Sequence, residues 1–233
     1  MRGKLIVVEG TDCSGKETQT KKLVEKLTND NRQVKRYSFP MYDTPTGKIV
    51  GGPYLGKNYI CDGWFNEGAP QVPYKVASLY YAADRLYNIE KINKDIENGI
   101  DIILDRYVYS NMAHQGGKIK DKKERQEMYR WLEQLEFDLL GLPEPDIKIF
   151  LHMPTEYSKI LKQNRVEIAD QHEKDENHLK NAENSFLEIA ELYNFETIDC
   201  VKDKNIKSIE DINEELYEIV KKEINKKIIK KSK

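Results

Sequence analysis

The heptapeptide at residues 10–16, which reads G-T-D-C-S-G-K, constrains the fold more than any other part of this chain. It follows a short apolar run at residues 5–8 and precedes a segment whose apolar residues recur at helical spacing. This order predicts a strand, a glycine-framed turn and a helix. In such a unit the backbone N–H groups of the turn converge on an anion. Lys16 adds a full positive charge at the start of the helix. The sequence therefore predicts a nucleotide-phosphate site.

The position after the loop lysine departs from the usual pattern. It normally holds Ser or Thr, whose hydroxyl touches Mg²⁺, but here it is Glu17, followed by Thr18. A carboxylate beside a triphosphate is repelled by it unless a metal ion intervenes. Glu17 therefore either turns away from the phosphates or helps to hold Mg²⁺, directly or through water, and both alternatives stay open.

Length and composition are typical of one globular α/β domain over residues 1–233, with 39% hydrophobic and 33% charged residues. The formal net charge of −2 gives no reason to expect a nucleic acid or a membrane surface as a partner. Cys13, Cys61 and Cys200 lie far apart and are odd in number, which argues against a disulfide framework and fits a reducing cytoplasm. No apolar stretch approaches the roughly 20 residues that span a bilayer.

Apolar runs alternate with helical patterns along the chain. Strands are expected at residues 4–9, 33–39, 100–105, 147–153 and 196–199. Helices are expected at about 16–29, 73–97, 122–140, 155–164, 175–193 and 208–226. This alternation predicts a three-layer α/β fold, with a five-stranded parallel sheet covered by helices on both faces. Ligands bind such sheets beyond the carboxyl ends of the strands, so the loops after those ends are the candidate site.

Two segments stand outside this alternation. Residues 44–73 are rich in Gly, Pro and aromatic residues and are long for a connection. They form either an ordered loop that faces the substrate or a mobile insertion, and the aromatic residues favour order. Residues 221–233 are a lysine-rich helix end, for which a solvated surface is favoured over a nucleic-acid-binding arm.

Asp105 and Arg106 follow the buried strand at 100–105, at the sheet edge that carries the phosphate loop. The carboxylate can take Mg²⁺ through water, and the guanidinium can fork onto phosphoryl oxygens. A local Asp–Arg ion pair is the alternative. Because a phosphate loop lies at the same edge, we favour the metal and phosphate roles.

Tyr81 and Arg85 lie four residues apart on the long helix expected at 73–97, so they share a face. An aromatic ring one turn from an arginine suits a planar base with carbonyl edges. A stacked Tyr–Arg pair on an exposed helix is the alternative, and the two residues taken alone favour it.

Several motifs together resemble the thymidylate kinases over about residues 4–200. In chain order they read V-E-G-T-D-C-S-G-K, S-F-P, A-A-D-R, L-D-R-Y-V-Y-S-N-M-A, G-L-P-E-P-D-I-K-I-F-L and F-L-E-I-A. The resemblance implies a P-loop kinase fold with a short lid at about 162–174. It also implies transfer of the γ-phosphoryl of ATP to dTMP with Mg²⁺, and a homodimer.

The same resemblance implies the roles of individual residues. The catalytic residues would be Lys16, Asp12, Asp105, Arg106 and Arg165. The ATP-binding residues would be Gly10, Thr11, Asp12, Cys13, Ser14, Gly15, Lys16, Glu17 and Thr18. The acceptor-binding residues would be Asp12, Phe39, Pro40, Tyr42, Tyr81, Arg85, Arg106, Ser110, Asn111 and His114. Asp105, and Glu17 in one alternative, would hold the metal ion. Tyr81 would stack on thymine, and Arg85 would contact a base carbonyl.

This chain departs from the family pattern at four further positions. Tyr42 and Gln171 stand where the family often has arginines for the acceptor phosphate and in the lid, and Cys13 replaces a phosphate-loop arginine found in some members. Arg165 is then the arginine left to serve the lid. His114 replaces the tyrosine thought to exclude a ribose 2′-hydroxyl. A kinase for another deoxynucleotide or deoxynucleoside, or a nucleotide-binding regulator with weak turnover, is therefore the alternative function.

Overall fold

A five-stranded parallel sheet lies at the centre of the structure, a computed structural model that describes residues 2–162 and 176–226. Its strands are β1 (Leu5–Gly10), β2 (Val34–Ser38), β3 (Asp101–Asp105), β4 (Ile147–His152) and β5 (Glu196–Asp199). They lie in the order β2-β3-β1-β4-β5, and every neighbouring pair is parallel. The predicted sheet is confirmed, and each strand end lies within one residue of the position that the sequence predicts.

The strand register brings the predicted site together. Val8 pairs with Asp105, and Ser38 pairs with the same residue from the other side. The carboxyl ends of β1, β2 and β3 therefore meet at one edge, from which the phosphate loop continues into α1 (Lys16–Asn29).

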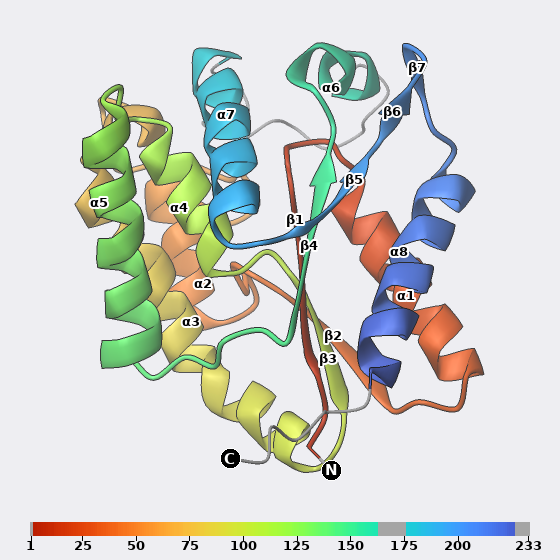
Figure 1. Ribbon diagram of the computed structural model, residues 1–233. Coiled ribbons are helices and arrows are strands. Elements are labelled where there is room, and N and C mark those ends of the chain that lie inside the picture. Colours follow the sequence, from red (N-terminus) through yellow and green to blue (C-terminus); the bar gives the residue numbers. More distant parts are fainter. Residues whose placement is uncertain (1, 163–175, 227–233) are drawn as a thin grey trace.

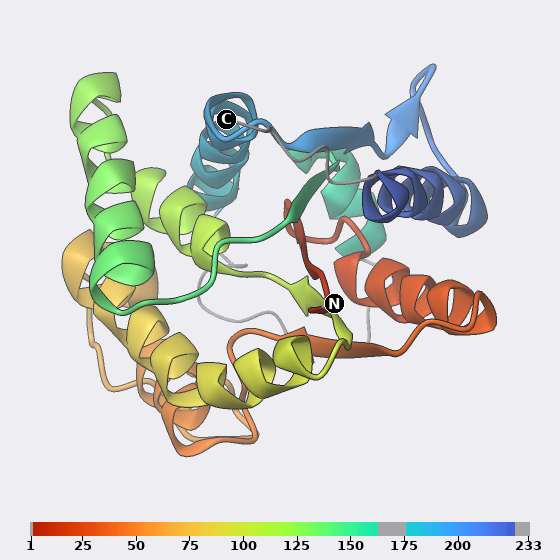
Figure 2. The ribbon, with the colours of Figure 1, turned by 60° about the horizontal axis from the view of Figure 1, so that its bottom comes forward.

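Helices cover both faces of the sheet (Figures 1 and 2). One face packs against α1 and α8 (Ile209–Asn225), and the other against α3 (Tyr74–Glu97), α4 (Val108–Gly116) and α7 (Glu176–Leu192). The alternation of β1 explains the two cores, because Ile6 and Val8 face the α1 side while Leu5 and Val7 face the α3 side. The helix α5 (Lys122–Glu133) and a π-helical turn at Gln134–Leu139 extend the second core.

The sequence did not predict α4. Every residue of this helix except His114 is buried, so its sequence lacks the polar face that marks an amphipathic helix. A small hairpin of β6 (Val201–Lys202) and β7 (Asn205–Ile206) was missed as well, because its strands are two residues long.

Residues 44–73 form a short helix and two tight turns. They contain α2 (Pro45–Ile49), a π-helical turn at Val50–Tyr54 and a 3₁₀ turn at Ala69–Gln71. These turns enclose a separate apolar cluster centred on Tyr54, whose ring meets Phe65, Tyr80 and Tyr81. The insertion thus packs on α3 and forms a wall beside the predicted acceptor residues.

The predicted lid lies mostly outside the described residues. Helix α6 (Thr155–Lys162) leads into it, but residues 163–175, with Arg165, are not described, and neither are residues 227–233 of the lysine-rich end. Within the described ranges, no helix has both the length and the apolar character needed to cross a membrane.

Candidate active site

The loop between β1 and α1 has the backbone shape of an anion-binding loop. Cys13 and Gly15 adopt left-handed torsions, with φ of 61° and 76°. A Cβ atom on Gly10 would lie 2.8 Å from the carbonyl oxygen of Leu151, so a larger residue would push the loop away from β4. Thr11 fixes the loop to β4, because its hydroxyl donates to the carbonyl oxygen of Met153 at 2.7 Å and accepts from its N–H at 3.0 Å.

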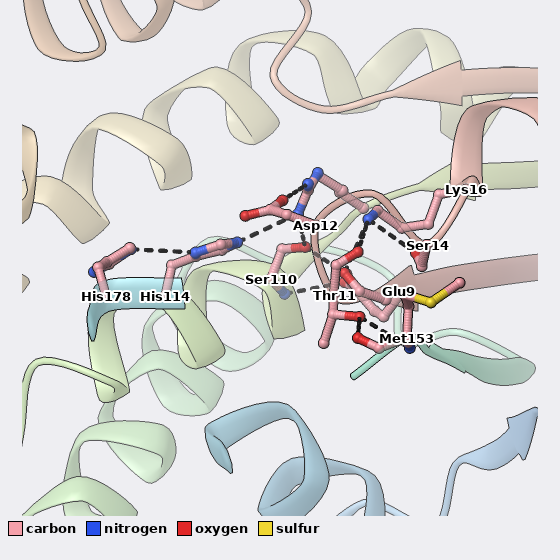
Figure 3. A network of polar contacts seen from close by, with 11 residues as sticks. Glu9, Thr11, Asp12, Ser14, Lys16, Ser110, His114, Met153 and His178 are labelled. Atoms are coloured by element: carbon pink, nitrogen blue, oxygen red, sulfur yellow. Dashed lines mark hydrogen bonds and ion pairs between the residues drawn. The ribbon is translucent and has the colours of Figure 1, made fainter. Parts of the chain in front are cut away.

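Lys16 lies inside this loop rather than in solvent (Figure 3). Its ammonium group donates to the carbonyl oxygens of Gly10 and Thr11 at 2.9 and 2.8 Å and contacts the Ser14 hydroxyl at 3.4 Å. Burial, reinforced by the charge of Arg106, lowers the pKa of Lys16 to about 8. These contacts hold a positive charge beside the converging N–H groups, where an incoming phosphate can take over the hydrogen bonds.

An ion pair joins the phosphate loop to the end of β3. Arg106 donates from Nη2 to Oδ1 of Asp12 at 2.6 Å. Although burial alone would raise it, the pKa of Asp12 is held well below its ordinary value, mainly by the Arg106 charge. Arg106 itself has φ of 67°, and its N–H donates to the carbonyl oxygen of Val8. Two predicted site residues from distant parts of the chain are thus in direct contact.

Glu9, which the sequence analysis did not identify, holds the residues that follow Arg106. Its Oε1 accepts from the N–H groups of Tyr107 and Ser110, and its Oε2 accepts from the Ser110 hydroxyl. Glu9 is 1% exposed, and burial raises the pKa of its carboxyl to about 6. Ser110 also lies 3.4 Å from Arg106, so the Glu9 carboxyl shapes the floor under that arginine.

Asp105 is held by an arginine that the sequence analysis missed. Arg36 of β2 donates to Oδ2 of Asp105 at 2.6 Å and to the hydroxyl of Thr20 at 2.7 Å. The chain has only eight arginines, so an arginine on a strand beside the site was a signal that could have been used. Glu17, by contrast, is largely exposed and pairs with Lys21 along the surface of α1.

The predicted acceptor residues gather between α3, α4 and the insertion. Phe39, joined to Pro40 by a cis peptide bond, is buried with its ring 6.2 Å from that of Tyr107. The half-buried ring of Tyr81 meets Tyr54 edge-on at 5.8 Å. At the start of the insertion, the Tyr42 ring lies 5.1 Å from the Lys57 ammonium group. The rings of Tyr42, Tyr54 and Tyr81 therefore form an aromatic wall between α3 and the insertion.

Arg85 is not an exposed partner of Tyr81. It is 2% exposed and makes a two-pronged ion pair with Glu136, which is fully buried. The amide of Asn111 donates to the same carboxylate at 3.2 Å. Glu136 was not predicted, because its partner lies 51 positions away in the sequence.

Three buried polar side chains line the helices next to this pair. Within the described part of the chain, the hydroxyl of Ser78, Oδ1 of Asn111 and both amide atoms of Gln115 have no hydrogen-bond partner. Gln115 follows Asn111 by four residues on α4, so the two share a helix face. That spacing was the available sequence signal for Gln115. Buried polar atoms are costly when unsatisfied, so this cluster suits a polar ligand or ordered water.

Known proteins with this architecture explain the arrangement. The sheet order and the loop between β1 and α1 define a P-loop kinase fold. The family model described as Thymidylate kinase matches residues 8–216, and the chain belongs to this family. The curated thymidylate kinase of Schizosaccharomyces pombe is 29% identical over 94% of this chain and 92% of its own. A probable thymidylate kinase of Pyrococcus abyssi is 31% identical over 96% and 98%.

A solved structure agrees with these sequence matches. The thymidylate kinase of Candida albicans superposes with a TM-score of 0.70 and 28% identity, over 96% of this chain and 93% of that chain. The Candida enzyme is described as having broad substrate specificity and a novel structural element.

Replacing Glu9 by Gln should stabilise the protein in a pH-dependent way. In the wild type, the pKa of Glu9 is raised from 4.5 to about 6 in the folded state, so the folded protein binds a proton more tightly than the unfolded chain does. The wild-type protein therefore loses stability as the pH rises from about 4.5 to about 6, and the Gln variant, which has no such charge, does not. The Oε1 atom of Gln can still accept from the N–H groups of Tyr107 and Ser110, and its amide group can donate to the Ser110 hydroxyl. Urea unfolding should show a gain of about 2 kcal/mol at pH 8 that vanishes near pH 4.

The matched control is Glu25→Gln on the exposed side of α1, which should give no such pH-dependent gain. An equal gain for Glu9→Gln at both pH values would show that burial of the Glu9 charge is not the cause.

Proposed function

We propose that this protein transfers the γ-phosphoryl group of ATP to dTMP, giving ADP and dTDP. The observation that carries the proposal is the contact between the two halves of the site. Lys16 lies in the phosphate loop, and Asp12 of the same loop pairs with Arg106 at the end of β3. The curated relatives bear the name of this activity, which favours it over the alternatives of another acceptor or a weakly active regulator.

The proposed mechanism relies on positioning and on charge neutralisation. The loop amides and Lys16 would hold the donor phosphates, while Arg106 would meet the acceptor phosphate and Asp12 the 3′-hydroxyl of the sugar. Because the acceptor phosphate is already an anionic nucleophile, the transfer needs no strong general base. In-line geometry and fixed positive charge would then supply most of the acceleration.

A magnesium ion fits this site through Asp105. Mg²⁺ at nucleotide sites usually takes one or two carboxylates and completes its shell with phosphates and water. The described residues offer no cluster of three or more metal-ligating side chains, so the nucleotide would have to supply ligands. Asp105, buried at the sheet edge, is the carboxylate proposed for this role, and Glu17 stays the alternative. The ion would neutralise charge on the β- and γ-phosphates.

The acceptor base would lie between the aromatic wall and α4. Tyr81 would stack on thymine, with Phe39, Pro40 and Tyr42 shaping the pocket. Ser110 and His114 would line its floor. Arg85 would contact a base carbonyl. Oδ1 of Asn111 and the amide of Gln115 have no hydrogen-bond partner among the described residues, so they offer groups for the hydrogen-bonding edge of a pyrimidine.

We further propose a role for the lid, a single-domain organisation and a location in the cell. Arg165 would close over the donor phosphates, at a lid of about residues 162–174. Residues 1–233 would act as one domain. The protein would work in the cytoplasm, where dTTP precursors and reducing conditions suit its separate cysteines.

An acceptor panel tests the reaction. With ATP and Mg²⁺, ADP formation should be fastest with dTMP among dTMP, dUMP, UMP, dGMP, dCMP and thymidine. Lys16→Ala should fold but keep less than about a tenth of wild-type kcat, because one fixed charge on the transferring group is worth several kcal/mol. Faster turnover of another acceptor would establish the alternative kinase, and ATP binding without turnover would establish the regulator.

Arg85 can be tested separately for stability and for recognition. Arg85→Met leaves Glu136 buried without its partner and should cost about 3–5 kcal/mol of unfolding free energy. The double variant Arg85→Met/Glu136→Gln should recover most of that loss, because no charge stays buried. Its KM for dTMP should still be raised about tenfold or more, with little change for ATP. A normal KM for dTMP in the double variant would make Arg85 purely structural.

The proposed homodimer has a candidate surface on α3. Exposed apolar side chains recur along one side of this helix at Val76, Leu79, Leu86 and Tyr87. Leu79 and Leu86 are seven residues apart and Val76 and Tyr87 are eleven apart, which is about two and three helical turns, so the four lie on one side that a second copy of the same helix could cover. Such a stripe on a charged protein is typical of an interface.

Leu79→Glu combined with Leu86→Glu should therefore convert the protein to a monomer. Sedimentation velocity measures the change directly. Leu139→Glu, at a more exposed apolar residue outside α3, is the control and should leave the dimer intact. A wild-type protein that sediments as a monomer would contradict the proposed dimer.

A further inference from the structure

Two histidines from different helices meet next to Arg106. Nδ1 of His114 on α4 lies 3.4 Å from Nε2 of His178 on α7 (Figure 3). The ring planes differ by 17°, and the ring centroids are 5.6 Å apart. That separation is close to the largest that a 3.4 Å contact between two ring atoms permits, so the nitrogens point at each other in the plane of both rings. The contact has the geometry of an N–H···N hydrogen bond.

The other side of His114 fixes the direction of this hydrogen bond. Nη1 of Arg106 lies 3.3 Å from Nε2 of His114, and a guanidinium can only donate. Nε2 must therefore be the acceptor. Burial, together with the Arg106 charge, lowers the pKa of His114 to about 3, so the ring is neutral and its proton sits on Nδ1. That proton is donated to Nε2 of His178.

We propose that His178 is a positioning residue for phosphoryl transfer, which acts by holding His114 in the tautomer that accepts from Arg106. The proposal rests on the proposed function, in which Arg106 meets the acceptor phosphate. His178 makes no contact with the reacting groups in this scheme. It acts through a chain of donors and acceptors that runs from Asp12 through Arg106 and His114 to α7.

The tautomer matters because the alternative would repel the arginine. With its proton on Nε2, His114 would present an N–H to the N–H of Arg106, and the guanidinium would have to move. Which ring nitrogen carries the proton is set by the hydrogen bond that the other nitrogen makes. Here that hydrogen bond is made to His178, which is 5% exposed and thus shielded from competing water.

Packing keeps the two rings in register. The rings of His114 and of Phe186 on α7 are nearly perpendicular at a centroid distance of 5.7 Å, and Phe186 stacks on Phe150 of β4. A displacement of α7 would therefore move His178 and Phe186 together. The position of α7 is in this way coupled to the orientation of the Arg106 side chain.

A matched pair of variants separates positioning from packing. His178→Gln supplies an amide oxygen that can take the place of Nε2 as the acceptor, whereas His178→Met has a similar length and no such oxygen. We expect kcat/KM for dTMP to fall about tenfold or more in His178→Met and clearly less in His178→Gln. The KM for ATP should change little in either. Equal losses in the two variants, or full activity of His178→Met, would overturn the proposal.

A spectroscopic measurement of the His114 tautomer does not depend on which nucleotide the enzyme phosphorylates. The chain has four histidines, so ¹⁵N spectra of the labelled protein can be assigned by comparison with His114→Tyr. Wild-type His114 should be neutral with its proton on Nδ1, and His178→Met should shift this equilibrium. A proton on Nε2 in the wild type would refute the inference even if dTMP is phosphorylated. Failure of the wild type to phosphorylate dTMP would refute the proposed function instead and leave the tautomer result standing.

Discussion

The ion pair between Asp12 and Arg106 is the contact on which the rest of the site depends. It joins the loop after β1 to the loop after β3 across neighbouring strands. Arg106 reaches this position because its backbone is left-handed and its N–H is tied to Val8. The Glu9 carboxyl then orders the first turn of α4 from below. Without the parallel register of β1 and β3, none of these side chains would share an edge.

Three carboxylates at or near this edge each face an arginine. Arg106 faces Asp12, Arg36 faces Asp105 and, deeper between α3 and α4, Arg85 faces Glu136. Such pairs contribute little net stability, because the cost of removing both charges from water offsets their attraction. Their effect is on side-chain orientation, because a carboxylate or a guanidinium that is bound to its partner keeps one rotamer. A site of this kind is organised before its substrates arrive, which is the condition for electrostatic catalysis.

Local patterns were enough to predict the frame of the site. The apolar runs and the glycine-framed loop predicted the parallel sheet, and the placement of Lys16, Asp105 and Arg106 at one edge followed from the ends of β1 and β3. The helix α4 escaped because it is buried on nearly all sides, so its apolar residues show no period. The short strands of the hairpin after β5 carry too few residues to show any pattern.

The residues that sequence reasoning missed are those whose meaning depends on a distant partner. Arg36 is 69 positions from Asp105, and His178 is 64 positions from His114. In the sequence, we cannot distinguish such an arginine on a strand, or such a histidine on an amphipathic helix, from an ordinary surface residue. Only the fold shows which residue is its partner. His114 shows the limit most clearly. From the sequence it is a substitution at the sugar pocket, but the tautomer of its ring, and so its effect on Arg106, is set by a helix that the sequence places after the lid.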